Sequence, residues 1–327
     1  MTARPRHRGR RRTVSVLAAA ALLALAACSS SADIEAEARE GTADPQAVSV
    51  DTSPDQDRVH TTVSDEAVAL LPPGAFPDGV LRVSVTQGAV PLAFYADDNT
   101  TVIGSETDLA TLFADALGLE LELVVVDWSN WPLAVQSGEV DAVVSNVTVT
   151  EERKQLYDFA TYRVDQLGWL VGADSGLSIS AAPDVAGLTV GVSSGTNQEQ
   201  VLLSWDAENV AAGLEPVTID YHQSYNDAVL ALQSGRLDAY VGPNPTAAYS
   251  AATSPQDFAI AGTTNGGWPA TADIAVTTVK GNGYAEAFAA AIDHAIADGS
   301  YAEVLARWGL GAEAVDASRV NPPGLGS

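Results

Sequence analysis

The stretch LAVQSGEVDAVVSN at residues 133–146 is nearly repeated as LALQSGRLDAYVGP at residues 230–243. Eight of the first twelve positions are identical, and the two copies begin 97 residues apart. In each copy a short apolar helix pattern stops at a glycine, Gly138 or Gly235, and an apolar strand pattern follows. The repeat therefore predicts the same helix–glycine–strand element in two halves of the chain.

Both halves place this element within a similar series of strands and helices. Such alternation is typical of βαβ units around a mostly parallel sheet, so we expect an α/β fold. Ligands of open parallel sheets bind beyond the carboxyl ends of the strands, and two facing lobes would enclose a small molecule. Apart from the first copy of the repeat, the expected strands are residues 80–85, 121–127, 188–192, 217–221 and 237–242. The expected helices are residues 106–118, residues 225–235, the second part of residues 193–205 and two helices that end at Gly299 and Gly309.

The first 27 residues have the composition of a secretion signal. Six arginines and no acidic residue come first, and an apolar run from Val14 to Ala27 follows. This run is shorter than the roughly 20 apolar residues that span a bilayer. It ends in Leu25-Ala26-Ala27-Cys28, which resembles a bacterial lipobox and implies a lipid anchor on Cys28 at the outer face of the cell membrane. Ordinary cleavage that leaves a free thiol is the alternative, since the chain has a single cysteine.

The charge of the chain limits its partners. Removal of residues 1–27 leaves 10 Lys and Arg against 42 Asp and Glu, a formal charge of −32. We therefore expect no binding to nucleic acid, and no attachment to membranes other than through the lipid. Residues 28–76 combine serine, acidic residues and proline with little hydrophobic periodicity, which predicts a flexible acidic tether. About 250 residues remain, enough for two small domains with cores of their own.

The string SNVTVTEERKQLYDF at residues 145–159 resembles the signature of family 3 solute-binding proteins, the polar amino-acid receptors of bacterial ABC importers. The resemblance covers roughly residues 77–312 and includes G-x-x-x-DLA (104–110), DW (127–128), VGVSSGTNQE (191–199) and DGSYAEVLARWG (298–309). It implies a two-lobed fold of the periplasmic-binding-protein type II class, with lobe I at residues 77–165 plus 268–320, lobe II at residues 166–267 and a cleft between them. It also implies a lipoprotein that closes on a small carboxylate-bearing solute, an amino acid or derivative, and delivers it to a membrane permease.

The resemblance assigns the principal ligand contact to Arg153, whose counterpart grips the ligand carboxylate. A guanidinium suits this role because it offers a planar fork of donors to two carboxylate oxygens. A surface arginine paired with Glu151 or Glu152 is the alternative. The resemblance also implies that Trp128 packs on the ligand body, for which a core tryptophan is the alternative. The other implied ligand contacts are Thr148, Ser145, Asn146, Thr196, Asn197 and Asn244.

The stretch Gly195-Thr196-Asn197 is expected to open a helix in the second lobe. Free N–H groups and the helix dipole favour a negative group there, so both lobes would share the ligand carboxylate and closure would complete its contacts. Capping of the helix alone also explains Asn197.

One position departs from the family pattern. Pro243 stands where these receptors usually carry an acidic partner for the ligand's α-ammonium, and proline can neither pair with a cation nor donate an N–H. The neighbouring Asn244 offers only a neutral acceptor. Either another acid takes the ammonium, or the ligand lacks an ordinary α-ammonium. The candidate acids are Asp97, Asp98 and Asp220.

Two other functions are possible on this fold. A receptor for a signalling partner would use the same cleft. An enzyme similar to the dehydratases of this fold would need a catalytic group, and His222 is the histidine that could border the cleft. The sequence contains no metal-ligand cluster, phosphate loop or activated-nucleophile motif. We therefore expect a monomeric binding protein without cofactor, metal or catalytic activity.

Overall fold

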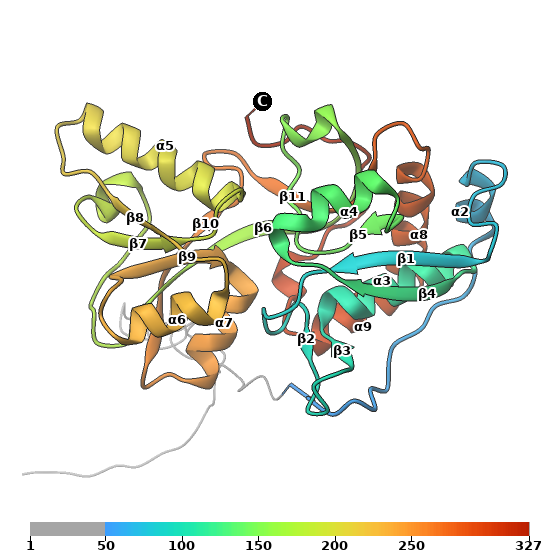
Figure 1. Cartoon of the computed structure of the whole chain (residues 1–327), viewed down its shortest axis with the longest axis horizontal. Helices are drawn as coiled ribbons and strands as arrows, with labels where there is room; N and C mark the ends of the chain where they lie inside the picture. Colours follow the sequence, from blue (N-terminus) through green and yellow to red (C-terminus); the bar gives the residue numbers. More distant parts are fainter. Residues whose placement is uncertain (1–49, 327) are drawn as a thin grey trace, which may run out of the picture. The chain divides into compact units, whose positions relative to one another are not determined.

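The fold is organised by one long strand, β6 (Tyr157–Gly172), in a computed structural model that describes residues 50–326. Within these residues β6 joins two groups of strands into a single nine-stranded sheet (Figure 1). It pairs with β11 as far as Asp165 and with β9 and β10 from Gln166 onward. The change of pairing coincides with the position where the sequence analysis places the first crossover between lobes. The three partner strands are β11 (Ala272–Val279), β9 (Ala239–Pro243) and β10 (Phe258–Asn265).

Lobe I has the strand order β4-β1-β5-β11, in which β1 runs parallel to both β4 and β5. Helices α3, α8 and α9 pack on one face of the sheet and supply its main apolar core. Helix α4 packs on the other face, where Trp131 and Tyr157 anchor a smaller cluster. The elements are β1 (Val80–Val85), β2 (Phe94–Tyr95), β3 (Val102–Ile103), α3 (Ser105–Leu117), β4 (Glu120–Val125), α4 (Trp131–Ser137), β5 (Ala142–Val143), α8 (Ala285–Asp298) and α9 (Ser300–Arg307).

Lobe II has the strand order β9-β7-β8, all in parallel, with β10 on the far side of β6. Its core is centred on Trp169 and Trp205, whose rings stack with centroids 5.2 Å apart and an interplanar angle of 9°. Trp268 meets Trp205 edge-on. The elements are β7 (Thr189–Val192), α5 (Asn197–Ala211), β8 (Thr218–Tyr221), α6 (Tyr225–Gln233) and α7 (Asn244–Thr253).

The repeated phrase forms the expected element twice, as α4 followed by β5 and as α6 followed by β9. Gly138 and Gly235 have φ values of 76° and 70°, in the left-handed region that glycine adopts without steric cost. The expected parallel pairs are present within each lobe. Strand β6 runs antiparallel to each of its neighbours β9, β10 and β11, so the sheet is mixed.

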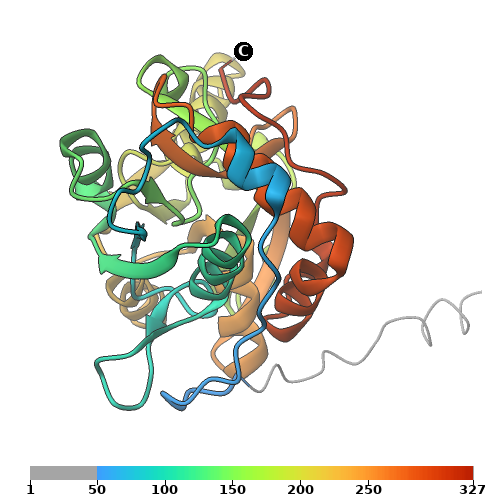
Figure 2. The same ribbon diagram turned by 90° about the vertical axis from the view of Figure 1, so that its right-hand side faces the viewer.

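The expected tether is wrong for residues 50–76, which pack against lobe I. Helix α2 (Asp65–Leu70) is capped by the Ser64 side chain and lies against α8 (Figure 2). The Arg58 guanidinium pairs with the buried carboxylate of Asp108, and Val59 packs on the lobe I core. The expected signal sequence, Cys28 and the first part of the tether lie outside the described residues. No helix within residues 50–326 is long and apolar enough to cross a membrane.

Candidate functional site

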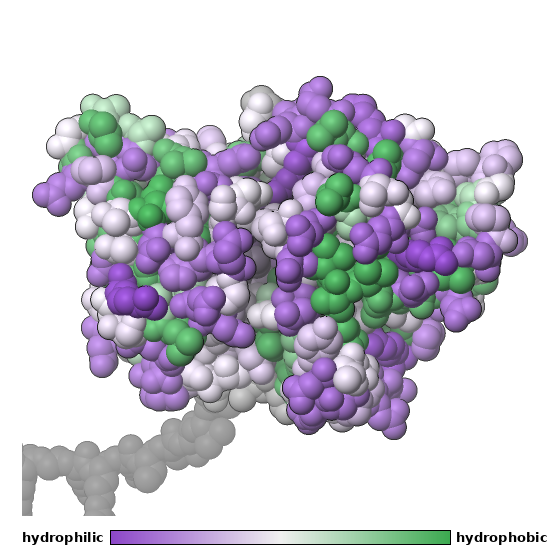
Figure 3. All heavy atoms as spheres, in the orientation of Figure 1, coloured by the Kyte–Doolittle hydropathy of each residue, from purple (hydrophilic) through white to green (hydrophobic). Residues whose placement is uncertain are grey.

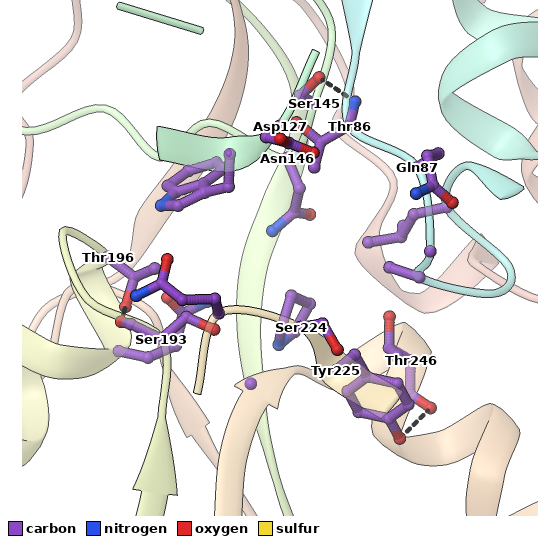
Figure 4. A pocket seen from close by; sticks show the side chains of 18 of the residues that line it. Thr86, Gln87, Asp127, Ser145, Asn146, Ser193, Thr196, Ser224, Tyr225 and Thr246 are labelled. Carbon is purple, nitrogen blue, oxygen red and sulfur yellow. Dashed lines mark hydrogen bonds between the residues drawn. The ribbon is translucent and has the colours of Figure 1, made fainter. Parts of the chain in front are cut away.

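A pocket of about 410 Å³ lies between the lobes and is lined by residues from both (Figures 3 and 4). Its lining follows the carboxyl ends of the parallel strands, where ligands of open α/β sheets bind. Lobe I contributes Thr86 and Gln87 after β1, Asp127 and Trp128 after β4, and Ser145 and Asn146 after β5. Lobe II contributes Ser193 after β7, Gln223 and Ser224 after β8, and Gly242 and Pro243 at the end of β9.

Three buried polar atoms in the pocket wall have no hydrogen-bond partner within residues 50–326. They are the side-chain oxygens of Thr86, Gln198 and Thr246. A buried polar atom without a partner costs about 1–3 kcal/mol. A polar solute in the pocket could supply these missing partners, which makes the wall suited to a ligand rich in hydrogen-bonding groups.

The charged residues that line the pocket are acidic. They are Glu106 and Asp127, and no lysine or arginine belongs to the lining among the residues that the structure describes. Glu106 is buried, and its two oxygens accept from Arg163 Nη2 at 2.9 Å and from the Tyr162 hydroxyl. Asp127 is exposed. Arg163 balances the charge of Glu106, which leaves Asp127 as the exposed acidic group of the lining.

Four of the residues expected at the site line the pocket: Trp128, Ser145, Asn146 and Thr196. The ring of Trp128 also packs against Trp131, with centroids 6.1 Å apart, so it contributes both to the pocket and to a core cluster. The other four expected residues lie outside the lining. They are Arg153, Thr148, Asn197 and Asn244.

Local hydrogen bonds hold the polar lining residues in place. Ser145 Oγ accepts from the backbone N–H of Thr86 at 2.9 Å and donates to the carbonyl of Ser84 at 3.2 Å. Asn146 has a φ of 52°, and its Oδ1 accepts from Arg163 Nη2 at 2.6 Å. Thr196 caps α5 by accepting from the backbone N–H of Glu199 at 3.1 Å. Figure 4 shows the lobe I residues facing Thr196 and Ser193 of lobe II across the cavity.

Beside the pocket, a buried carboxylate on β6 connects the two lobes. Thr148 Oγ1 of lobe I donates to Asp165 Oδ2 at 2.8 Å, and Asn197 Nδ2 of lobe II donates to the same oxygen at 2.7 Å. The Asn197 amide also donates to the Gly266 carbonyl at 2.9 Å. Burial raises the pKa of Asp165 to about 6, against the hydrogen bond from Thr148, which lowers it. We call Thr148, Arg153, Asp165 and Asn197 the crossover network.

Arg153 completes this network with bonds to backbone carbonyls of both lobes. Its Nη1 donates to the Thr148 carbonyl at 2.8 Å and its Nη2 to the Gly195 carbonyl at 3.0 Å. Burial lowers the pKa of Arg153 to about 10, while the charge of Asp165 opposes this shift, so the guanidinium is charged at neutral pH. The expected alternative, a pair with Glu151 or Glu152, is not formed within the described residues, and Glu151 pairs with Lys154 instead.

A buried arginine, Arg163, lies behind the lobe I wall. Arg163 pairs with Glu106 and Glu313, and these two carboxylates raise its pKa although burial opposes the charge. Asn244 Nδ2 donates to Glu313 Oε1 at 3.3 Å, so this asparagine belongs to the arginine cluster rather than to the pocket lining.

The acids considered for an α-ammonium lie outside the lining. Asp98 accepts from the backbone N–H groups of Thr100 and Thr101 in an exposed turn, and Asp220 lies 3.4 Å from His222 Nε2. Neither Asp97 nor His222 lines the pocket in the described part of the chain, whereas Pro243 does. Among residues 50–326 no group of three His, Cys, Asp or Glu could hold a metal ion.

Several lining residues were not predicted from the sequence. Those of lobe II include residues at the starts of helices, such as Ser224 and Tyr225 of α6 and Thr246 in the first turn of α7. The available signal was positional, because most of these residues follow the end of an expected parallel strand.

Two lobes joined by crossing strands, with a polar pocket between them, define a solute-binding protein of the periplasmic-binding-protein type II fold. The chain belongs to the bacterial extracellular solute-binding proteins, family 3, whose sequence profile matches residues 81–311. The family and fold predicted from the sequence are confirmed.

Named relatives and solved structures are similar over most of the chain. The arginine-binding protein ArgT of Corynebacterium glutamicum is 29% identical over 263 residues, which cover 78% of this chain and 83% of ArgT. The amino acid ABC transporter substrate-binding protein AbpA of Streptococcus pneumoniae, bound to L-arginine, is 25% identical with a TM-score of 0.62 and covers 72% of this chain and 98% of its own. An ancestral amino acid-binding protein described as a precursor of cyclohexadienyl dehydratase is 26% identical with a TM-score of 0.61, over 71% of this chain and 96% of its own.

Proposed function

We propose that this chain is the solute-binding component of an ABC importer, which binds an amino acid or amino-acid derivative between its lobes and delivers it to a membrane permease. The observation that carries the proposal is the pocket of about 410 Å³ with buried, unpartnered polar atoms from both lobes. This volume falls within the roughly 300–1,000 Å³ of small-molecule sites. The names of ArgT and AbpA support an amino-acid ligand and a transport role.

Closure of the lobes is part of this proposal. Because Thr86 belongs to lobe I and Gln198 and Thr246 to lobe II, a solute satisfies all three only when the lobes are together. Such a ligand has a higher affinity for the closed form and shifts the population toward it. The segments that cross between the lobes, β6 and the connection from β10 to β11, are the natural hinge.

The lipid anchor on Cys28 is proposed from the sequence alone and would hold the receptor at the outer face of the membrane, near its permease. Binding without turnover is also proposed. No histidine or cysteine lines the pocket among residues 50–326, and His222 lies outside the lining, with its Nε2 atom 3.4 Å from Asp220.

The ligand chemistry expected from the sequence is a carboxylate held by Arg153. To bind one, the guanidinium would have to exchange the carbonyls of Thr148 and Gly195 for the ligand.

A matched pair of threonine variants tests the proposed site. Thermal-shift measurements across L-amino acids, their amides and the corresponding amines identify ligands, and calorimetry then gives their affinities. Thr246→Val removes an unpartnered hydroxyl from the pocket wall, whereas Thr107→Val removes one that is equally buried in α3, outside the lining. We expect Thr246→Val to weaken binding roughly threefold to tenfold, the value of one hydrogen bond, and Thr107→Val to leave the affinity unchanged.

The proposal fails if no member of the panel raises the melting temperature. It also fails if both variants reduce affinity equally, since the bound site would then lie elsewhere.

A further inference from the structure

Residues 312–326, which we call the C-terminal segment, lie beyond the part of the chain that the family profile matches. The segment contributes no residue to the pocket lining in the described part of the chain. It nevertheless runs along lobe I, and in Figure 1 the end of the chain, marked C, lies next to the loop that follows β5. It can therefore affect the pocket only through the residues that it contacts.

The loop at residues 145–153, between β5 and β6, carries four of the eight ligand contacts that the resemblance implies. Ser145 and Asn146 line the pocket, and Thr148 and Arg153 belong to the crossover network beside it. A movement of this loop would therefore displace residues at the pocket.

The backbone of this loop is bonded to β11 and to the C-terminal segment. The N–H of Val149 donates to the Asp273 carbonyl of β11 at 2.9 Å. The carbonyl of Val149 accepts from the N–H of Leu325 at 3.2 Å, and the N–H of Glu151 donates to the Leu325 carbonyl at 3.0 Å. The loop is thus paired with two other stretches of backbone, and the C-terminal segment supplies one of them.

The contact between the segment and the loop is close enough to require glycine at position 324. The N–H of Gly324 donates to Glu151 Oε1 at 2.9 Å, and this bond lowers the pKa of Glu151. A Cβ atom on Gly324 would lie 2.5 Å from the carbonyl oxygen of Val149 and 2.8 Å from its carbon. Lys154 Nζ adds a bond to the Pro322 carbonyl at 3.2 Å. A side chain at position 324 would therefore push the segment away from the loop.

The start of the segment reaches the same loop through a buried ion pair. The carboxylate of Glu313 is buried and pairs with Arg163. Arg163 Nη2 in turn donates to Asn146 Oδ1 at 2.6 Å and to Glu106 Oε1 at 2.9 Å, and both of these residues line the pocket. The two ends of the segment thus support one wall of the pocket.

We propose that the C-terminal segment is a positioning element of the binding site, which holds the loop at residues 145–153 in the geometry that a solute requires. This inference rests on the proposed function. Without the bonds from Gly324 and Leu325, β11 alone would pair with the loop backbone, and the loop would occupy its binding geometry for a smaller fraction of the time. The apparent affinity falls in proportion to that fraction.

A matched pair of glycine variants tests the inference. Gly324→Ala places a methyl group against the Val149 carbonyl, whereas Gly311→Ala places one where no atom lies within 4 Å. Hydrogen exchange of the ligand-free proteins reports on residues 147–154. Calorimetry well below the melting temperature measures the affinity for L-arginine, which AbpA binds, and for any other panel compound that binds the wild type.

We expect Gly324→Ala to accelerate exchange in the loop roughly tenfold or more and to weaken binding about fivefold or more. Gly311→Ala is expected to match the wild type in both measurements. A purely structural role would lower the melting temperature of Gly324→Ala and leave the affinity of the folded protein unchanged.

Unchanged loop exchange or unchanged affinity in Gly324→Ala overturns the inference and leaves the proposed function intact. If no compound binds the wild type, the proposed function fails instead, and the exchange measurement alone decides whether the segment holds the loop.

If Gly324→Ala does not fold, Leu325→Pro provides the same test. It removes the N–H that donates to the Val149 carbonyl and adds no atom at position 324. We expect faster exchange in the loop and a loss of affinity of the same size. Wild-type behaviour of this variant in either measurement contradicts the inference.

Discussion

The crossover network and the pocket wall are neighbouring sets of buried polar residues that differ in how their hydrogen bonds are satisfied. In the crossover network the hydroxyl of Thr148 and the amide nitrogen of Asn197 both donate to the carboxylate of Asp165. In the pocket wall the oxygens of Thr86, Gln198 and Thr246 find no partner within residues 50–326. Both sets draw residues from both lobes.

The paired groups of the crossover network stabilise the folded protein, whereas the unpaired groups of the pocket wall still lack a hydrogen-bond partner. Buried polar atoms in folded proteins are nearly always paired, so an unpaired one requires an explanation. A family motif marks residues of both sets, since it includes Thr148 and Arg153 as well as Ser145 and Asn146. Ser145 and Asn146 line the pocket whereas Thr148 and Arg153 do not, so position in the fold, rather than residue type, separates them.

The largest effect is expected from removing a paired arginine near the pocket. Arg163→Met leaves the buried carboxylates of Glu106 and Glu313 without their cation. We expect the free energy of unfolding to fall by about 3–5 kcal/mol, the typical cost of breaking a buried ion pair from one side. Denaturant unfolding followed by fluorescence measures it.

The matched control is Arg82→Met, which removes a more exposed guanidinium paired with Asp78 at 2.7 Å and Glu122 at 3.3 Å. Its loss is expected to stay below about 1 kcal/mol. Equal losses in the two variants would mean that the Arg163 cluster contributes no more than a surface pair.

The next effect concerns the pH dependence that Asp165 gives to stability. Its pKa is about 6 in the folded protein against an ordinary value of 3.8, so the folded state binds the proton more tightly than the unfolded chain. Ionisation of Asp165 therefore lowers the free energy of unfolding. The loss is close to zero below about pH 4 and reaches about 3 kcal/mol above pH 6.

Asp165→Asn removes this dependence. The stability of the wild type relative to Asp165→Asn is expected to decrease as the pH rises from 4 to 6 and then to level off, as measured by denaturant unfolding at a series of pH values. A relative stability that increases over this range would show that the network favours the ionised carboxylate, with a pKa below the ordinary value.

Much of the fold could be predicted because its signals are local. Glycine stops, helical spacing and apolar strand runs lie within about a dozen residues of one another, and they predicted α3, α4, β1 and the repeated element. The position of the pocket followed from the same elements, since Trp128, Ser145, Asn146 and Thr196 come just after strand ends or at a helix start.

What the sequence did not predict depends on contacts between distant segments. Asp165 is one polar residue within the long strand β6, and its partners Thr148 and Asn197 belong to other elements, 17 and 32 positions away. The packing of residues 50–76 likewise depends on Arg58, whose partner Asp108 lies 50 positions along the chain. No local pattern marks such pairs.

The smallest expected effect comes from the same substitution, threonine to valine, made once in the crossover network and once in the pocket wall. Without ligand, Thr148→Val deprives the buried Asp165 carboxylate of a donor, and we expect the free energy of unfolding to fall by about 1–3 kcal/mol. Thr246→Val removes a hydroxyl that has no partner within residues 50–326, so its loss is expected to be close to zero, or the variant to be slightly more stable. Denaturant unfolding of both variants under one set of conditions measures the contrast. Equal losses would mean that the Thr246 hydroxyl is already satisfied in the free protein, and the pocket wall would then have no unmet hydrogen bond at this position for a solute to complete.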